Sequence, residues 1–144
     1  MLVQQILKAR GNNPVITVKP GTLVADAVST LAERRIGVLV VSPDAERAVG
    51  ILSERDIVRS LALRGAGCLT EAVDQMMTRN PVCASPGDSS DAVLKRMTEG
   101  RFRHMPVTED GKMIGIVTIG DVVHARLSEL SMEKDALQGM IMGH

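Results

Sequence analysis

GILSERD, from Gly50 to Asp56, and GIVTIGD, from Gly115 to Asp121, are two versions of one seven-residue pattern. Each version begins with glycine, carries a hydroxyl residue at its fourth place and ends in aspartate. The apolar residues after each glycine are typical of a β-strand, and the hydroxyl residue is typical of a helix start. The pattern therefore predicts the same strand-to-helix junction at two places in the fold.

The duplication extends beyond these seven residues. Asp26-Ala27-Val28 precedes the first version by the same distance at which Asp91-Ala92-Val93 precedes the second. Two further pairs match with spacings that differ by one or two residues: Asn13-Pro14-Val15 with Asn80-Pro81-Val82, and Pro20-Gly21 with Pro86-Gly87. Agreement at so many turn-forming residues indicates an internal repeat with small length changes in its loops.

Both copies have the periodicity of a β-α-β-β-α unit. The expected strands are Val15–Val18, Val38–Val41 and Ala48–Leu52 in the first copy, and Val82–Ala84, His104–Val107 and Met113–Val117 in the second. These short runs are bounded by turn residues, as strands are.

Helices are expected between and after these strands. Val24, Ala27, Val28 and Leu31 form one apolar helix face in the first copy, and Ser89 or Ser90 caps a helix with Val93 and Met97 in the second. The closing helices are Glu54–Leu63 and Ile119–Leu130, and a short helical stretch at Glu71–Met76 links the copies.

The predicted fold is α+β, with two such units packed as a pseudo-twofold pair. One unit of three short strands buries too little apolar area to stand alone, so we expect the copies to pack sheet to sheet around one shared core. The boundaries are 1–67 for the first repeat with an N-terminal helix, and 68–144 for the second with a C-terminal helical tail. The cleft at the pseudo-twofold axis is the natural place for a ligand.

Composition excludes several classes of function. The net charge is +0 and aromatic residues make up 1%, which argues against a broad nucleic-acid surface or a base-stacking platform. No apolar run approaches the length of a membrane span, and the N-terminus does not resemble a signal peptide. Cys68 and Cys83 lack metal or disulfide spacing. We expect a cytoplasmic protein with reduced thiols and no bound metal.

The repeated pattern permits two interpretations. Ser53 with Asp56, and Thr118 with Asp121, have the spacing of helix N-caps, which satisfy free backbone N–H groups. A helix N-terminus also attracts phosphate, and a carboxylate one turn later can accept both hydroxyls of a ribose. Gly50 and Gly115 would let a flat base approach the backbone. Duplication in the same register favours a nucleotide site in addition to the caps.

The paired patterns, the Pro-Gly punctuation and the β-α-β-β-α unit resemble the CBS (cystathionine-β-synthase) domain, over about Val15 to Leu130. The resemblance implies a tandem, Bateman-type module that binds an adenine nucleotide between its repeats. The expected ligand is AMP or NAD(H), with ATP or S-adenosylmethionine as alternatives. It also implies a sensor of energy or redox state for an unknown regulated protein, and not an enzyme.

The resemblance implies two sets of binding residues. The first site would use Ile51, Ser53 and Asp56, with Arg55 as an added phosphate ligand, closed by Val82, Cys83 and Phe102 or Arg103. The second would use Ile116, Thr118 and Asp121, with Arg103 and His104 facing phosphates and Val15, Ile16, Ile36 and Gly37 completing the adenine slot. Gly120 replaces Arg55 in the second copy, so a cation is missing there unless Arg101, Arg103 or His104 supplies one.

Several features keep a structural alternative open. Arg101, Arg103 and His104 could be a solvated strand edge, and His124 and His144 lack metal-ligand spacing. The tail from Ser128 to Met142 continues as a helix, with Leu127, Leu130, Leu137 and Ile141 on one stripe and Lys134 between them. That stripe either packs on its own domain or forms the seam of a homodimer. The rival function is a structural dimerisation module that binds no ligand.

Overall fold

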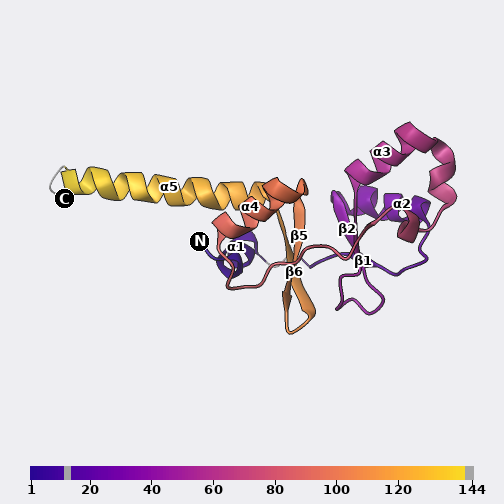
Figure 1. Ribbon diagram of the computed structural model, residues 1–144, viewed down its shortest axis with the longest axis horizontal. Helices are drawn as coiled ribbons and strands as arrows, with labels where there is room; N and C mark the ends of the chain where they lie inside the picture. The colour runs from indigo at the N-terminus through magenta and orange to yellow at the C-terminus, as the bar shows by residue number, and fades with distance from the viewer. Residues whose placement is uncertain (12–13, 142–144) are drawn as a thin grey trace.

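The chain folds into two α+β units that lie side by side, with one long helix extending from the second unit (Figure 1). The computed structural model describes residues 1–11 and 14–141. Asn13 of the repeat, Met142 of the tail and His144 lie outside the described residues. The two units follow the repeat predicted from the sequence.

The first unit contains β1 (Thr17–Val18), α2 (Val24–Arg34), β2 (Val38–Val41), β3 (Gly50–Ser53) and α3 (Glu54–Arg64). Its sheet has the order β1-β2-β3-β4, with β1 parallel to β2 and the other neighbours antiparallel. β4 (Thr78–Arg79) comes from the linker and was not predicted, because its two residues are exposed and carry no apolar signal. The predicted strand at 15–18 is only two residues long, and the predicted strand at 48–52 lies at Gly50–Ser53.

The linker between the units is mostly 3₁₀ helix, at Ala66–Thr70 and Val73–Gln75. The second unit contains α4 (Ser90–Gly100), β5 (His104–Glu109), β6 (Lys112–Thr118) and α5 (Ile119–Ile141). The strands β5 and β6 form an antiparallel hairpin. The predicted strand at 82–84 is reduced to a single parallel bridge between Ala84 and Val107, which takes the place that β1 has in the first unit.

Each unit has its own hydrophobic core, so the expectation of one shared core was wrong. The first core lies between the sheet and its helices, around Val24, Leu39 and Leu52. The second lies between the hairpin, α4 and α5, around Met97 and Met105. Each sheet covers its apolar face with its own helices, which leaves the surfaces between the units free to form cavities.

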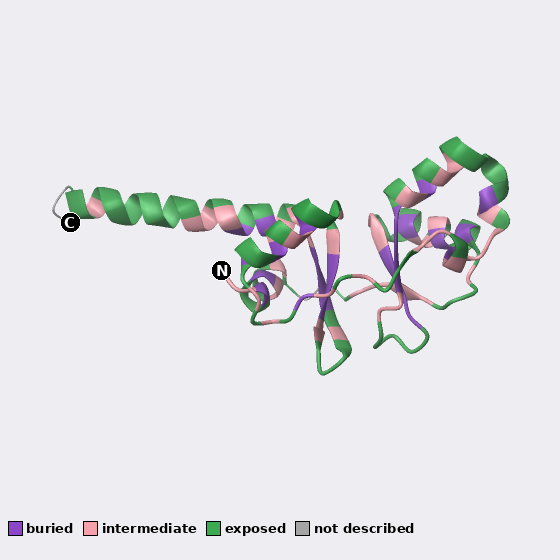
Figure 2. Cartoon of the chain, viewed as in Figure 1, coloured by how far each residue is buried: buried purple, intermediate pink, exposed green. Residues whose placement is uncertain are grey.

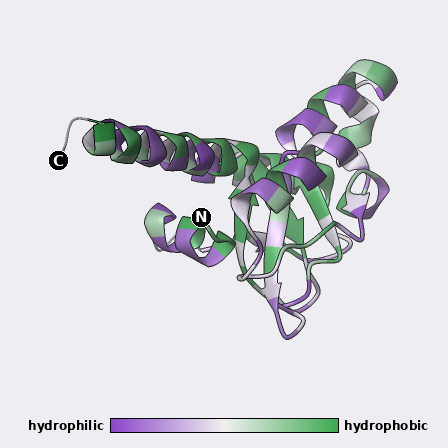
Figure 3. Ribbon diagram, turned by 60° about the vertical axis from the view of Figure 1, so that its left-hand side comes forward, coloured by the Kyte–Doolittle hydropathy of each residue, from purple (hydrophilic) through white to green (hydrophobic). Residues whose placement is uncertain are grey.

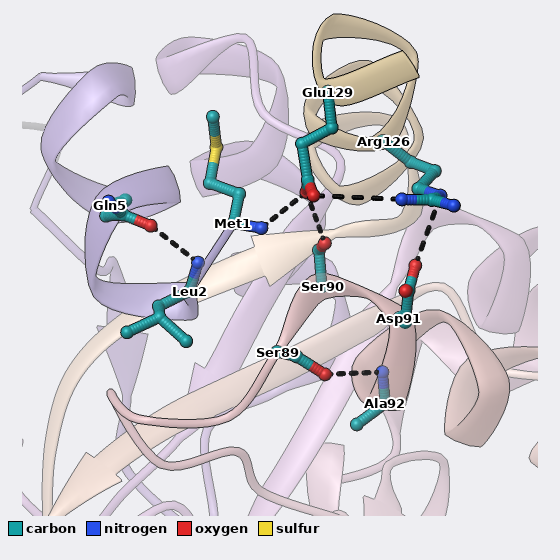
Figure 4. Close-up of polar contacts among 9 residues, drawn as sticks. All are labelled: Met1, Leu2, Gln5, Ser89, Ser90, Asp91, Ala92, Arg126 and Glu129. Atoms are coloured by element: carbon teal, nitrogen blue, oxygen red, sulfur yellow. Dashed lines mark hydrogen bonds and ion pairs between the residues drawn. The ribbon is translucent and has the colours of Figure 1, made fainter. Parts of the chain in front are cut away.

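The helix α1 (Val3–Arg10) packs on the second unit, although the predicted boundary grouped it with the first. Its buried residues Val3 and Ile6 belong to the core of the second unit. The residues before it are held at the start of α4, where the Met1 amino group lies 2.5 Å from Glu129 and Ser90 donates to the same carboxylate (Figure 4). Residues that begin the chain therefore complete the second repeat.

The helix α5 projects away from the body of the protein. It runs for 23 residues, and beyond Glu129 nearly all of them are exposed (Figure 2). Hydrophobic and hydrophilic residues alternate along α5 (Figure 3). No helix in the described part of the chain is long and apolar enough to cross a bilayer. The apolar stripe of the tail therefore does not pack on its own domain.

Candidate functional site

Both repeated patterns form helix caps, as the sequence predicted. Ser53 accepts a hydrogen bond from the Asp56 N–H at 3.3 Å, and Asp56 accepts one from the Ser53 N–H at 2.9 Å. Thr118 and Asp121 repeat this reciprocal arrangement at 3.1 and 2.9 Å. These bonds satisfy backbone donors at the starts of α3 and α5, and they fix the orientation of each aspartate.

The first cavity has a volume of about 280 Å³ and lies between the start of α3 and the loop that leads into β5. Its volume is close to the range usual for small-molecule sites. Its lining includes these residues that the sequence analysis singled out: Ile51, Ser53, Arg55, Asp56, Val82, Arg101, Phe102, Arg103 and His104. The structure thus brings together residues from both repeats that lie far apart in the sequence.

Four arginines make the first cavity strongly basic: Arg55, Arg59, Arg101 and Arg103. None of them forms an ion pair with another residue in the described ranges 1–11 and 14–141. Arg59, one helical turn after Arg55, was missed because an arginine inside a helix carries no signal of a site. Unpaired guanidinium groups around a cavity attract phosphate or carboxylate groups.

The second cavity is related to the first by the repeat and has a volume of about 460 Å³. Its lining includes these expected residues: Val15, Ile16, Ile36, Gly37, His104, Ile116 and Thr118. Arg10 and Arg34 also line it, and both were missed by the sequence analysis. They supply the positive charge that the replacement of Arg55 by Gly120 removes from this copy.

Arg103 lines the first cavity, as expected, but not the second, and Cys83 does not lie where it was expected. The residue that corresponds to Arg103 in the first repeat, Gly37, lines the second cavity instead. Cys83 lines neither cavity. Its thiol turns back toward the carbonyl of Pro81, at 3.4 Å, and burial raises its pKa. Neighbouring residues of an extended segment point to opposite sides, so Val82 faces the cavity and Cys83 does not.

Asp121 was expected in the second site but does not line the second cavity; it lines a neighbouring pocket beside α1 and is already paired. Arg10 Nη1 lies 3.3 Å from Asp121 Oδ2 and donates a hydrogen bond to the carbonyl of Ile116. Nothing in the sequence pairs position 10 with position 121, so only the docking of α1 reveals this contact.

The two repeated glycines have a different role from the expected approach of a base. A Cβ at Gly50 would lie 2.3 Å from the sulfur of Met77, and one at Gly115 would lie 2.8 Å from Leu7 of α1. Neither glycine lines the first or the second cavity. Both glycines therefore make room for side chains packed on the opposite face of the strand.

His104 lies in the wall of both cavities. Burial lowers its pKa below the ordinary value of 6.5, while the carboxylates of Asp56 and Asp121 act in the opposite direction. The charges of both repeated aspartates therefore act on the pKa of the same imidazole, that of His104. In the described part of the chain, no group of three His, Cys, Asp or Glu residues has the arrangement of a metal site.

The family profile of the CBS domain matches residues 6–63 and 73–128. These segments cover most of the chain and coincide with the two units, so this chain belongs to the CBS domain family and carries a tandem pair. The first segment begins within α1, although that helix packs on the second unit.

Solved structures and curated relatives share this organisation. The CBS-domain containing protein ATU1752 from Agrobacterium tumefaciens is 40% identical, with a TM-score of 0.81 over 88% of this chain and 99% of that one. The CBS domain pair of protein MJ0100, solved with 5'-methylthioadenosine and S-adenosyl-L-methionine, is 26% identical with a TM-score of 0.76, over 90% and 98% of the two chains. The protein CBSCBSPB2 of Arabidopsis thaliana is 32% identical over 124 residues, which are 86% of this chain. This chain spans 23% of the length of that relative.

Proposed function

We propose that this protein is a regulatory module that binds adenine nucleotides in the cavities between its two CBS repeats. The observation that carries this proposal is the first cavity, where Asp56 stands beside four arginines without ion-pair partners in the described chain. A carboxylate suits the hydroxyls of a ribose, and the guanidinium groups suit one or more phosphates. The adenosine ligands of the MJ0100 pair support the same class of ligand.

Each part of a nucleotide has a matching surface in the first cavity. Ile51 and Val82 offer apolar contacts for the base, and Asp56 faces the position of the ribose. Arg55 lines the cavity from α3, and Arg101 and Arg103 line it from the loop before β5, so phosphates would bridge the two repeats. AMP, ATP and NAD(H) all carry the required groups, and AMP needs the smallest cavity.

Binding between the units gives a route to regulation. A ligand that contacts both repeats favours the relative orientation in which both sets of contacts form, and it shifts the population toward that state. A regulated partner would recognise that orientation. The protein acts in this proposal as a sensor and not as an enzyme, since the cavities offer binding groups for a nucleotide and no assembled nucleophile and base.

We further propose that two copies associate through α5. Its exposed seam consists of Val123, Leu127, Leu130, Lys134, Leu137 and Ile141, which alternate at spacings of four and three residues. Such a repeat is the mark of a coiled-coil seam, and the apolar members are 40–84% exposed in one copy. An isolated helix with such a stripe gains most of its stability from a partner.

The seam is complementary to itself when the two helices run antiparallel. With Lys134 opposite Leu130 of the second copy, Leu127 falls opposite Leu137 and Val123 opposite Ile141. A parallel pair in register would instead set two Lys134 ammonium groups against each other, which is unfavourable. A single lysine among apolar residues thus favours the antiparallel homodimer.

Ligand binding is tested by thermal unfolding and calorimetry with AMP, ADP, ATP, NAD, NADH, S-adenosylmethionine and GMP. A ligand at 100 times its dissociation constant stabilises the fold by about 2.7 kcal/mol, which raises the midpoint by several degrees. The Asp56→Ala, Asp121→Ala double variant is expected to remain folded and to lose this shift.

Ser89→Ala is the matched control for this experiment. Ser89 caps α4 by accepting from the Ala92 N–H at 3.1 Å, and it lines neither cavity. Its loss is expected to weaken the fold to a similar degree without changing the affinity for nucleotide. The protein must first be shown to be free of carried-over nucleotide. If no compound then raises its unfolding midpoint, the repeated patterns are helix caps alone and the protein is a dimerisation module.

A further inference from the structure

Arg10 lines the second cavity and contacts two groups of the second repeat, Asp121 and Ile116, that correspond to Asp56 and Ile51 of the first cavity. Its guanidinium pairs with Asp121 at 3.3 Å and donates to the carbonyl of Ile116. The side chains of Arg10 and Asp121 are 30% and 22% exposed, so the pair is shielded from most of the solvent. The second cavity is therefore lined by an internal cation that already occupies the carboxylate proposed for the ribose.

The repeated pattern itself contributes to this placement. Leu7 packs over Gly115, where a Cβ would approach it to 2.8 Å, so the glycine allows α1 to lie close to β6. Val3 and Ile6 anchor the same helix in the core of the second unit. The helix ends at Arg10, and Gly11 follows with a φ of 83° that favours glycine. The position of Arg10 is thus set by a docked helix.

The first cavity has no equivalent contact. Asp56 accepts hydrogen bonds from the backbone N–H and the hydroxyl of Ser53, and no cation in the described part of the chain lies within ion-pair distance of it. A ribose reaches Asp56 without displacing a charge. Arg10 lines the second cavity and Asp121 does not, so a ribose in that cavity must first separate Arg10 from Asp121.

We propose that Arg10 makes the second cavity selective for phosphorylated adenosines over uncharged ones. This inference rests on the proposed function and concerns only its second site. A ligand that carries a phosphate gives the displaced guanidinium a new anionic partner, and such bonds are often bidentate. Adenosine gives it none, so its binding leaves a partly buried cation without a counter-charge.

Removal of Arg10 therefore has opposite effects on two related ligands. Arg10→Ala frees Asp121, so adenosine should bind the second cavity about tenfold more tightly. The same variant lacks the guanidinium that receives the phosphate, so AMP should bind about tenfold more weakly. A residue that only stabilised the fold would change both affinities in the same direction.

Calorimetry with AMP and adenosine tests this on the full chain. The Asp56→Ala variant silences the first cavity, so the remaining binding reports on the second, and Arg10→Ala is then added to it. Arg10→Lys keeps the charge and should retain part of the preference for AMP. Lys8→Ala is the control, since it removes one exposed positive charge from the same helix and leaves the pair with Asp121 in place.

The outcomes separate this inference from the proposed function. Opposite changes for AMP and adenosine in Arg10→Ala, absent in Lys8→Ala, support the role of Arg10. If both affinities change equally or in the same direction, the role of Arg10 is wrong. The proposed function still stands in that case, provided that the first cavity binds AMP before Asp56→Ala is introduced. Absence of AMP and adenosine binding at both cavities of the unmodified protein overturns the proposed function and this inference with it.

Discussion

The carboxylate of Asp56 accepts two hydrogen bonds from one residue, the backbone N–H and the hydroxyl of Ser53, each at 2.9 Å. Its counterpart Asp121 accepts the backbone N–H of Thr118 at 2.9 Å and pairs through the same oxygen, Oδ2, with Arg10. Two copies of one sequence pattern therefore hold their aspartates in different electrostatic surroundings. The two cavities are equivalent in fold and unequal in chemistry.

Replacement of the first hydroxyl should separate the cap from the site. Ser53→Ala removes a cap hydrogen bond and is expected to lower the free energy of unfolding by about 1 kcal/mol. It should also weaken AMP binding at the first cavity, because Asp56 loses a bond that orients it. Urea unfolding and calorimetry measure the two effects. Both are measured in the Asp121→Ala background, so that binding reports on the first cavity. A loss of stability with unchanged AMP affinity there would show that Ser53 is a cap only.

The partly buried imidazole of His104 should make stability depend on pH. Because the pKa of His104 is lowered in the folded protein, the unfolded chain takes up the proton first. The contribution of His104 is fully present above pH 6.5 and is lost as the pH falls through its folded pKa. Asp56, Asp121, Glu54 and Arg103 are the charged groups that act on it. Urea unfolding between pH 7.5 and 5.5 should show this decline.

His104→Gln is the variant that tests the assignment. It should flatten the decline between pH 6.5 and 5.5, and leave the fall at lower pH that comes from paired carboxylates such as Asp88, whose pKa is lowered by hydrogen bonds from the Ser85 N–H and from Arg96. A proton-resonance titration of His104 that gave an ordinary or raised pKa would contradict the prediction.

The two separate cores should respond separately to cavity mutations. Leu39→Ala in the first unit and Met105→Ala in the second each remove a fully buried side chain and should cost about 2–5 kcal/mol of stability. Leu63→Ala is the control, since that side chain is 78% exposed and its change should stay within about 0.5 kcal/mol. Hydrogen exchange would locate each loss in the unit that carries the change. Equal loss of protection in both units would instead indicate one cooperative core.

The seam of α5 should decide the oligomeric state. Leu137→Glu places a charge in the apolar seam and should convert the dimer to a monomer in light scattering. Met132→Glu is the matched control: it is 59% exposed, as Leu137 is, but lies on the opposite face of the helix. If both variants remain dimeric, the copies associate through another surface. If the unmodified protein is monomeric, the proposal of a seam is wrong.

Much of the fold follows from short-range patterns. The caps at Ser53, Ser89 and Thr118 were predicted because a cap involves residues only three places apart. The hairpin of β5 and β6 was predicted because β-branched runs flank a turn, and Asp110 and Gly111 have the positive φ that such turns require. The strand at 82–84 was overestimated because its pairing depends on a partner more than twenty residues away in the sequence.

The repeat determined the family, the number of units, the helix caps and half of the residues that line the first cavity. Tertiary structure alone decided that α1 joins the second unit, that each unit has its own core, and that Arg10 meets the second cavity. Arg10 and Ile116 are 106 positions apart, and no periodicity or motif links residues at such a distance. Local patterns report which elements form, whereas the contact of one charge with another depends on how those elements dock.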